Sequence, residues 1–472
     1  MASLTRMAIN SVLLLGAAGC YSPRQTRGES EALAIYHQSV QPDQTLRFHG
    51  RASTPLPRPA PGVAGAPLTV DAAIALAKRN SARLTAIDAR IAAADAAIDA
   101  AGQRANPALH VSNVKVARAI DNGQFPSMVP RLRFSPERPG EIPAREAEAR
   151  AASQEARAEA RIEERAIEAE VRWLFDDVVL LDAEIAAAER AAATRRRLAS
   201  QTRERLASAT ATSVDVSLAD LHAIDADARV AERRSRRALV VAELLDRIGR
   251  PPGTQLELLG DPMAWPPPPL PSEQVLIETA LKSSPRIAGA AARIDGASAR
   301  VDLERTRRWP WLRFVDVGYE IDPTPTTNVP LWTLGAGVEL PIFSANGGAI
   351  RQAEASRAAA EHRFEAEVET IVRDVRARLR EANSAATMVT ELRSTALPLL
   401  ENASIETARA LESGSIDLLR ALTIDERRAH VELKLLDFVR RYRSAVDALR
   451  RAVGGPLLSS VTTAVDERRA PR

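Results

Sequence analysis

The sequence has little of what catalytic and metal-binding proteins depend on. Its 472 residues include one cysteine, six histidines and only 4% aromatic residues. One cysteine excludes a disulfide framework and a cysteine-based structural zinc site. No Ser-His-Asp, HExxH or phosphate-loop pattern stands out. We therefore predict that the protein is not an enzyme and that it has no catalytic residue, no metal site and no cofactor.

An excess of charge of one sign is lacking too. Lys and Arg number 64 against 61 Asp and Glu, a net charge of +3. This balance gives no reason to expect nucleic-acid binding. Hydrophobic residues make up 45% of the chain, with alanine prominent among them, and charged residues make up 26%. Such a composition is typical of long helices with small side chains at their seams and charges outside.

Long apolar runs are missing, apart from a short one at the N-terminus. Arg6 precedes the mostly apolar stretch Met7–Ala18, which has the length of a signal-peptide core and is too short to span a bilayer. The stretch ends just before Cys20, the only cysteine. We interpret residues 1–19 as a lipoprotein signal peptide and Cys20 as the acylated residue. An ordinary secretory signal that happens to contain a cysteine is the alternative.

An internal duplication is what the sequence does have. Ser81-Ala82-Arg83-Leu84 returns as Ser284-Pro285-Arg286-Ile287, and Ala89-Arg90-Ile91 returns as Ala292-Arg293-Ile294, both 203 positions later. This period is far too long for a solenoid, so we infer a duplicated half-molecule. The predicted segments are an acylated proline-rich stretch 20–67, a first repeat 68–250, a proline-rich linker 251–271, a second repeat 272–456 and a tail 457–472.

The same order of elements is predicted in each half. Leu84, Ile87, Ile91, Ala94 and Ile98 have the 3-4 spacing of a seam on a helix of roughly 34 residues. A strand pair follows, at 108–134 in the first half and 311–340 in the second. A helical segment of about 60–65 residues comes next, then a return helix. The shorter helices together match the long one, so we expect long antiparallel coiled-coil packing.

The strands predict a membrane role. Trp332, Leu334, Ala336, Val338 and Leu340 alternate onto one face. Strands of about 8–10 residues with one apolar face suit a bilayer crossing. Four strands cannot close a barrel, whereas three chains would supply twelve. Three tryptophans near the strand ends suit an interfacial girdle, namely Trp309, Trp311 and Trp332. The predicted fold is therefore mainly α-helical with a membrane β-barrel formed by a trimer.

Two stretches carry a family resemblance. Leu334–Phe343 with Gly347-Gly348, and Leu397–Glu401 with Ser413–Leu419, resemble the TolC-type outer-membrane factor family. The resemblance covers roughly residues 68–455. It implies a homotrimer with a twelve-stranded barrel and an α-helical periplasmic tunnel, which docks onto a periplasmic adaptor and an inner-membrane transporter. It also implies a strand-to-helix turn at Pro341, Phe343, Gly347 and Gly348.

The function implied is that of an exit duct. Such a channel, in the outer membrane and lipid-anchored, passively conducts substrates for a tripartite efflux pump or a type I secretion system. The alternative is a lipid-anchored periplasmic coiled-coil adaptor or scaffold. An adaptor of that kind would show a compact β-rich domain flanked by one helical hairpin, whereas this sequence predicts two duplicated strand–helix halves.

The reversals after the long helices are the candidate docking tips. Their residues are Ala209, Ser213 and Asp215 in the first half, and Gly414, Ser415 and Asp417 in the second. Ala209 stands where the family usually has glycine. The polar residues could simply cap helices, or they could also contact an adaptor and line the closed end of the tunnel. Nearby charges could form gating ion pairs or be ordinary solvated charges, namely Arg203, Arg205, Asp220, Asp225 and Asp425. His222 and His430 are interpreted as surface residues.

Overall fold

The computed structural model describes residues 67–115, 127–260, 265–320, 331–413 and 415–454. The chain divides into two units, Met1–Ala64 and Gly65–Arg472, and every described residue belongs to the second. The predicted signal peptide, Cys20, the tail 457–472 and Gly414 lie outside the described residues. Among the helices of the described ranges, none has a stretch long and apolar enough to cross a membrane.

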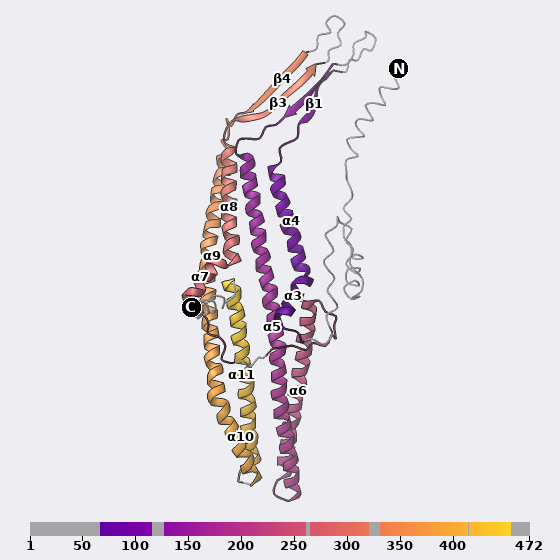
Figure 1. Ribbon diagram of the computed structural model, residues 1–472, viewed down its shortest axis with the longest axis vertical. Helices are drawn as coiled ribbons and strands as arrows, with labels where there is room; N and C mark the ends of the chain where they lie inside the picture. The colour runs from indigo at the N-terminus through magenta and orange to yellow at the C-terminus, as the bar shows by residue number, and fades with distance from the viewer. Residues whose placement is uncertain (1–66, 116–126, 261–264, 321–330, 414, 455–472) are drawn as a thin grey trace, which may run out of the picture. The chain divides into compact units, whose positions relative to one another are not determined.

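Both halves of the chain follow the same order of elements (Figure 1). The first half consists of α3 (Val70–Asn80), α4 (Ala82–Gly102), β1 (Ala108–Lys115), β2 (Ser127–Phe134), α5 (Glu141–Ala207) and α6 (Ser213–Ile248). The second consists of α7 (Glu273–Ser283), α8 (Pro285–Thr306), β3 (Trp311–Glu320), β4 (Leu331–Glu339), α9 (Gly347–Glu391), the π-helical segment η2 (Leu392–Ala396), α10 (Leu397–Glu412) and α11 (Leu418–Val453).

The opening helix of each half is broken, where the apolar spacing predicted one helix of roughly 34 residues. Ser81 has an extended backbone between α3 and α4, and its Oγ accepts a hydrogen bond from the Leu84 N–H at 3.3 Å. Ser284 is extended in the same way between α7 and α8, and Pro285 is the first residue of α8. A serine N-cap and a proline at the first helical position both favour starting a new helix there.

The second long helix is also interrupted, whereas α5 is continuous. In η2 the Leu397 N–H donates to the Leu392 carbonyl, five residues back, as in a π-helix. Pro398 follows at the start of α10. Proline has no N–H, and in a regular helix its ring would collide with the carbonyl four residues earlier. The predicted segment 348–411 is therefore helical but not one regular helix.

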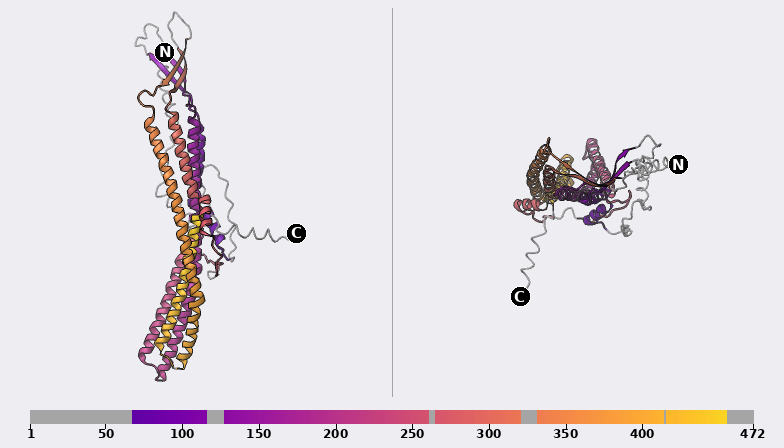
Figure 2. Two further views of the ribbon diagram at one scale, coloured as in Figure 1. Left: turned by 90° about the vertical axis from the view of Figure 1, so that its left-hand side faces the viewer. Right: turned by 90° about the horizontal axis from the view of Figure 1, so that it is seen from above.

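Helix α5 packs against helices of both halves. Its 67 residues extend about 100 Å at ~1.5 Å per residue. It contacts α4 and α6 of its own half and α8 and α11 of the other. In Figure 1, α4 and α6 follow one another along α5, as the predicted stacking requires. Figure 2 shows α9 running along α8 and α11 in the same way.

Two equivalent hydrophobic cores show the duplication directly. In the first half, Ala73 and Ala77 of α3 pack on Val171 of α5 and on α6. In the second half, Leu276 and Ala280 of α7 pack on α9 and α11. Leu276 and Ala280 stand 203 positions after Ala73 and Ala77, which is the separation found in the sequence. The repeated sequence therefore builds a repeated core, with a short helix laid across two long ones.

The strands form one antiparallel sheet with the order β1-β2-β3-β4. Each half contributes one hairpin, and β2 pairs with β3 to join the halves. The register aligns Leu132 with Val317 and Val317 with Leu334. The four strands lie where the sequence predicts them, and β1 and β4 form the two edges of the described sheet.

Candidate functional site

One face of the sheet is apolar and exposed. Side chains of paired residues in an antiparallel sheet lie on the same face, so the register sorts them into two sets. The exposed fractions of Leu334 and Leu109 are 81% and 73%. The apolar set comprises Leu109, Val111, Leu132, Phe134, Val317, Tyr319, Trp332, Leu334 and Val338. Such a continuous apolar surface is a contact surface for lipid or another protein.

The opposite face is polar and organised around one carboxylate. Asp316 of β3 is fully buried. Its Oδ2 accepts hydrogen bonds from Arg133 Nη2 at 2.9 Å and from Arg133 Nε at 3.2 Å. Its Oδ1 lies 3.5 Å from Arg131 Nη1. Both arginines belong to β2, so this cluster fastens the first-half hairpin to the second-half hairpin.

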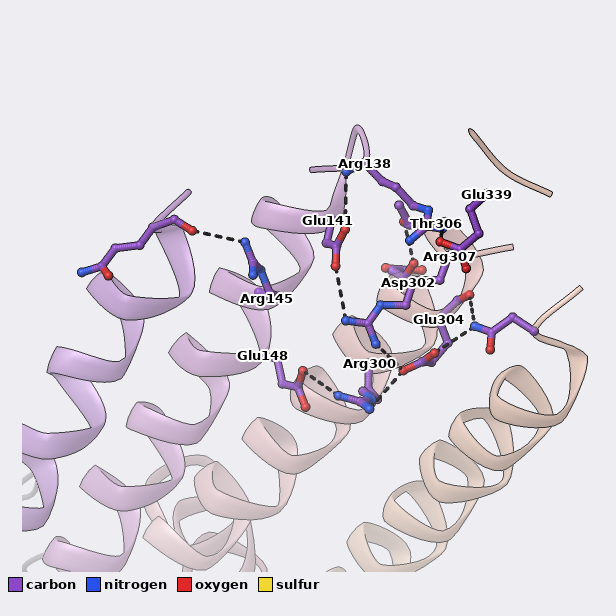
Figure 3. Close-up of polar contacts among 12 residues, drawn as sticks. Arg138, Glu141, Arg145, Glu148, Arg300, Asp302, Glu304, Thr306, Arg307 and Glu339 are labelled. Atoms are coloured by element: carbon purple, nitrogen blue, oxygen red, sulfur yellow. Dashed lines mark hydrogen bonds and ion pairs between the residues drawn. The ribbon is translucent and has the colours of Figure 1, made fainter. Parts of the chain in front are cut away.

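A second charged cluster lies where the sheet meets the helices (Figure 3). Glu304 of α8 is only 5% exposed. Its carboxylate pairs with Arg300 Nη2 at 3.0 Å and Arg307 Nη1 at 3.3 Å, and it accepts a hydrogen bond from Asn346 Nδ2 at 2.9 Å. Arg307 also pairs with Glu141 at the start of α5, at 3.3 Å. The first turn of α5, the last turn of α8 and the start of α9 are therefore tied to one buried carboxylate.

The predicted strand-to-helix turn follows β4 at this junction. Pro341 is half-buried and Phe343 is fully exposed. Gly347 and Gly348 are the first two residues of α9. The left-handed backbone position is Asn346, with a φ of 57°. Asparagine tolerates this conformation better than most residues, and the Asn346 amide is held by Glu304. The geometry of the turn therefore depends on Asn346, which the sequence analysis did not single out.

The first-half tip is a Schellman reversal with alanine in the glycine position. The Thr210 N–H donates to the Arg205 carbonyl at 2.9 Å, and the Ala209 N–H donates to the Leu206 carbonyl at 3.0 Å. Ala209 has a φ of 59°. Glycine prefers this left-handed conformation because a Cβ crowds the backbone there. Ala209, which occupies the glycine position of this motif, is thus a position of backbone strain.

The helix that leaves this tip is capped by reciprocal hydrogen bonds. Thr212 Oγ1 accepts from the Asp215 N–H at 3.2 Å, and Asp215 Oδ2 accepts from the Thr212 N–H at 2.8 Å. Bonds from the Thr212 hydroxyl and N–H lower the pKa of Asp215. Ser213 is the first residue of α6, and its carbonyl accepts from Ser217 Oγ. Asp215 and Thr212 therefore form a capping box.

The second-half tip has the same plan. The Ser415 N–H donates to the Ala410 carbonyl at 2.9 Å, across the five-residue separation seen between Thr210 and Arg205. Asp417 is the N-cap of α11 and accepts from the Arg420 N–H at 3.0 Å. Gly414 lies outside the described residues. Asp215 and Asp417 thus take part in helix N-caps, whereas Ser213 and Ser415 do not, and contact with an adaptor stays a prediction.

The comparisons with known proteins agree with this architecture. Residues 276–455 match the family model described as outer membrane efflux protein. The second repeat is an outer membrane efflux protein domain. The resemblance inferred from the sequence is thereby confirmed, and no curated protein sequence matches the chain.

Solved structures of outer membrane proteins and channels share the fold of this chain. The outer membrane protein VceC from Vibrio cholerae superposes with a TM-score of 0.69 at 17% identity, covering 82% of this chain and 96% of VceC. A membrane protein from Pseudomonas aeruginosa superposes with a TM-score of 0.68 at 18% identity, covering 84% of this chain and 92% of that protein. The MtrE outer membrane channel from Neisseria gonorrhoeae superposes with a TM-score of 0.66 at 16% identity, covering 82% of this chain and 89% of MtrE. At these identities the likeness establishes the fold.

The charges proposed for gating separate into two groups in the structure. Arg203 pairs with Asp220, and Asp225 pairs with Arg229, both on exposed surfaces within the first half. Two others join the halves. Arg205 Nη2 donates to the Leu411 carbonyl at the end of α10. Asp425 of α11 pairs with Arg195 of α5. His222 and His430 lie on α6 and α11, and the described residues contain no group of three or more potential metal ligands.

The sequence analysis missed Arg195, although a signal was present. Arg195 is 2% exposed and occupies the heptad position between Ala192 and Ala199 on a seam of small buried residues. Surface arginines do not normally occupy such a position, so an arginine in an alanine seam indicates a buried partner. The partner, Asp425, lies 230 positions later, beyond the range of local patterns.

A pair of carboxylates with raised pKa values lies where α5 and α11 pack together. Asp176 of α5 and Asp447 of α11 line a cavity of about 290 Å³ together with Arg172, Arg443 and Arg450. Burial raises the pKa of Asp447 to about 6, and the neighbouring Asp176 adds to the shift, while Arg450 and Arg172 oppose it. Burial also raises the pKa of Asp176, against the effect of Arg443.

Proposed function

We propose that the chain is the outer-membrane exit duct of a tripartite efflux pump or a type I secretion system. Three copies form a twelve-stranded barrel and an α-helical periplasmic tunnel, through which substrates pass without catalysis. One observation carries this proposal, a four-stranded sheet with an exposed apolar face, a polar face and two edge strands.

The apolar face supports a place in the lipid. Strands of 8 to 10 residues are close to the length of about 9–11 residues that a tilted strand needs to cross a bilayer. Trp309, 71% exposed, precedes β3 on the helix side, and Trp332, also 71% exposed, lies at the other end of the sheet. Tryptophan prefers the two membrane–water interfaces, so these positions suit a girdle at each boundary. Trp311 is different, because its Nε1 donates to the Pro136 carbonyl.

The edge strands support assembly from several chains. β1 and β4 each pair on one side within the chain. In lipid an unpaired strand edge leaves backbone N–H and C=O groups without water, at a cost of several kcal/mol for each group. Pairing β1 of one copy with β4 of the next removes both edges. Three copies give twelve strands, which is within the range of membrane barrels.

The proposed partners are a periplasmic adaptor at the tips and outer-membrane lipid at the N-terminus. Helix pairs α5–α6 and α10–α11 each end in a capped reversal, which is the surface offered to a periplasmic adaptor and, through it, to an inner-membrane transporter. Cys20 supplies a lipid anchor in the outer membrane. Labelling of cells with a clickable fatty acid is expected to mark the wild type and not Cys20→Ala, and equal labelling would exclude acylation at this residue.

The decisive experiment compares two leucines that are both largely exposed. Leu334 lies on the apolar face of the sheet, and Leu239 lies on α6, with exposed fractions of 81% and 73%. Leu334→Asp places a charge in lipid, so it should abolish outer-membrane recovery and the trimer seen by light scattering in detergent. Leu239→Asp should leave both intact and should restore export in a strain that lacks the protein. Normal membrane trimers of Leu334→Asp would contradict the proposal.

A further inference from the structure

On the polar face of the sheet, two partly exposed arginines surround one buried carboxylate, while Glu339 at the helix end of β4 pairs with Arg138. The side chains of Arg131 and Arg133 are 27% and 30% exposed, whereas that of Asp316 is 0% exposed. All three lie in one hydrogen-bonded cluster on that face. A mobile ion that approaches this cluster therefore meets two guanidinium groups before it meets the Asp316 carboxylate, and the cluster carries one net positive charge.

Glycines on the neighbouring strands make this arrangement possible. A Cβ at Gly335 would lie 2.3 Å from Asp316 Oδ1, and a Cβ at Gly318 would lie 2.7 Å from Arg131 Cγ. The absence of those Cβ atoms lets both side chains lie down along the sheet. A Cβ at Gly337 would likewise lie 2.4 Å from the Phe314 ring.

Phe314 holds the second guanidinium in place. The Arg133 Cζ lies 4.0 Å from the centroid of the Phe314 ring, within the range of a cation–π contact. Arg133 is thus held from two sides, by the Asp316 carboxylate and by the ring. A guanidinium fixed in this way stays on the polar face and does not extend freely into solvent.

We propose that this cluster makes the lumen of the barrel selective for anions, so that the duct favours substrates carrying carboxylate, phosphate or sulfate groups. The inference rests on the proposed function, because only in a barrel does the polar face line a pore. If the apolar face meets lipid, Arg131 and Arg133 face the lumen. Three copies would then line it with six guanidinium groups and three buried carboxylates. A charged lining in a narrow channel raises the local concentration of counter-ions, which here are anions.

The test is the reversal potential of the full-length protein in planar bilayers under a KCl gradient. The wild type should favour chloride over potassium. Asp316→Asn keeps the size of the side chain and exposes an uncompensated pair of arginines, so it should raise the chloride preference. Arg131→Gln and Arg133→Gln combined with Asp316→Asn remove every charge of the cluster without leaving a buried carboxylate. This triple variant should lower the chloride-to-potassium permeability ratio by about threefold.

A matched control removes the same number of arginines elsewhere. Arg234→Gln with Arg237→Gln breaks two exposed ion pairs between α6 and α5. Light scattering establishes that each variant is assembled as the wild type is. Opposite shifts in Asp316→Asn and the triple variant, with an unshifted control, support the inference. Equal reversal potentials in all proteins, or an equal shift in the control, overturn it while leaving the channel intact. Folded trimers that give no conductance would contradict the proposed function. They would also overturn the inference, because it rests on that function.

Discussion

Arg195 of α5 and Asp425 of α11 form a buried ion pair that joins the two halves of the chain close to the tips. The distance from Arg195 Nε to Asp425 Oδ2 is 3.0 Å, and the two residues are 2% and 9% exposed. Burial raises the pKa of Asp425, against the stabilising effect of Arg195 on its charged form. Each charge is thus tolerated in the helical interior chiefly because of the other.

Removing the arginine alone should loosen the tips. Arg195→Met leaves a buried carboxylate without its partner, which should lower the free energy of unfolding by about 3–5 kcal/mol. The melting temperature in detergent measures this loss. In cells, vancomycin sensitivity measures leakage through the loosened tips of the proposed duct. The control Arg190→Met breaks the exposed pair with Glu432 on the same two helices and should cost less than about 1 kcal/mol. Equal effects of the two substitutions would show that burial of the pair is unimportant.

Glycine at position 209 should stabilise the first-half tip. Ala209 has a φ of 59°, where a Cβ costs roughly 1 kcal/mol. Ala209→Gly should therefore raise the free energy of unfolding of the tip by about that amount, measured by hydrogen exchange of the last turn of α5. Ala211→Gly is the matched change two residues on, and it should stabilise nothing, because glycine there only adds freedom to the unfolded chain. Stabilisation by both would contradict the assigned strain.

The buried carboxylate at the junction should be the most sensitive residue between sheet and helices. Glu304→Ala leaves Arg300, Arg307 and the Asn346 amide without their shared acceptor, and should cost about 3 kcal/mol. Thermal melting and hydrogen exchange at the start of α9 report the effect. Glu148→Ala removes an exposed carboxylate that lies 3.7 Å from the same Arg300, and should cost less than about 0.5 kcal/mol. A small effect at Glu304 would show that the junction is held by packing alone.

The Asp447 carboxyl group should make stability depend on pH. Its pKa rises from 3.8 to about 6 on folding, so the folded state binds a proton more tightly than the unfolded state. Stability from this group is therefore greatest in acid and falls as pH rises from about 4 to about 6, by up to roughly 3 kcal/mol. Asp447→Asn lacks this titration, so its melting temperature relative to wild type should be higher at about pH 7 than at about pH 4. A constant difference across that range would exclude the raised pKa.

The sequence was sufficient to predict the elements but not all of their ends. The alternation from Trp332 and the 203-residue repeat predicted the strands, the long helices and their stacking, because these patterns are local or periodic. The breaks at Ser81 and Ser284 were missed because the apolar seam continues through them. The π-helical segment at Leu392 was missed because its cause, Pro398, lies at a position where proline is also compatible with a helix start.

The site residues also divide into those that local sequence patterns predict and those that they do not. The caps at Thr212, Asp215 and Asp417 follow from local hydrogen-bonding chemistry, which a sequence shows. The clusters around Asp316 and Glu304 depend on which strand or helix lies beside which. Their partners come from segments up to 185 positions away, so tertiary contacts decide them. Single-sequence patterns carry no information on such pairs.

If several copies close a barrel as proposed, the Asp316 cluster also sets an order of events in its assembly. It fastens β2 to β3, the seam within one chain, while in the proposed barrel β1 and β4 would pair only with neighbouring copies. A newly made chain should therefore complete its own sheet first and then exist briefly with two unpaired strand edges. Such edges recruit any available strand. In the proposed barrel, slow delivery to the membrane would therefore favour misassembly among the chain's own copies.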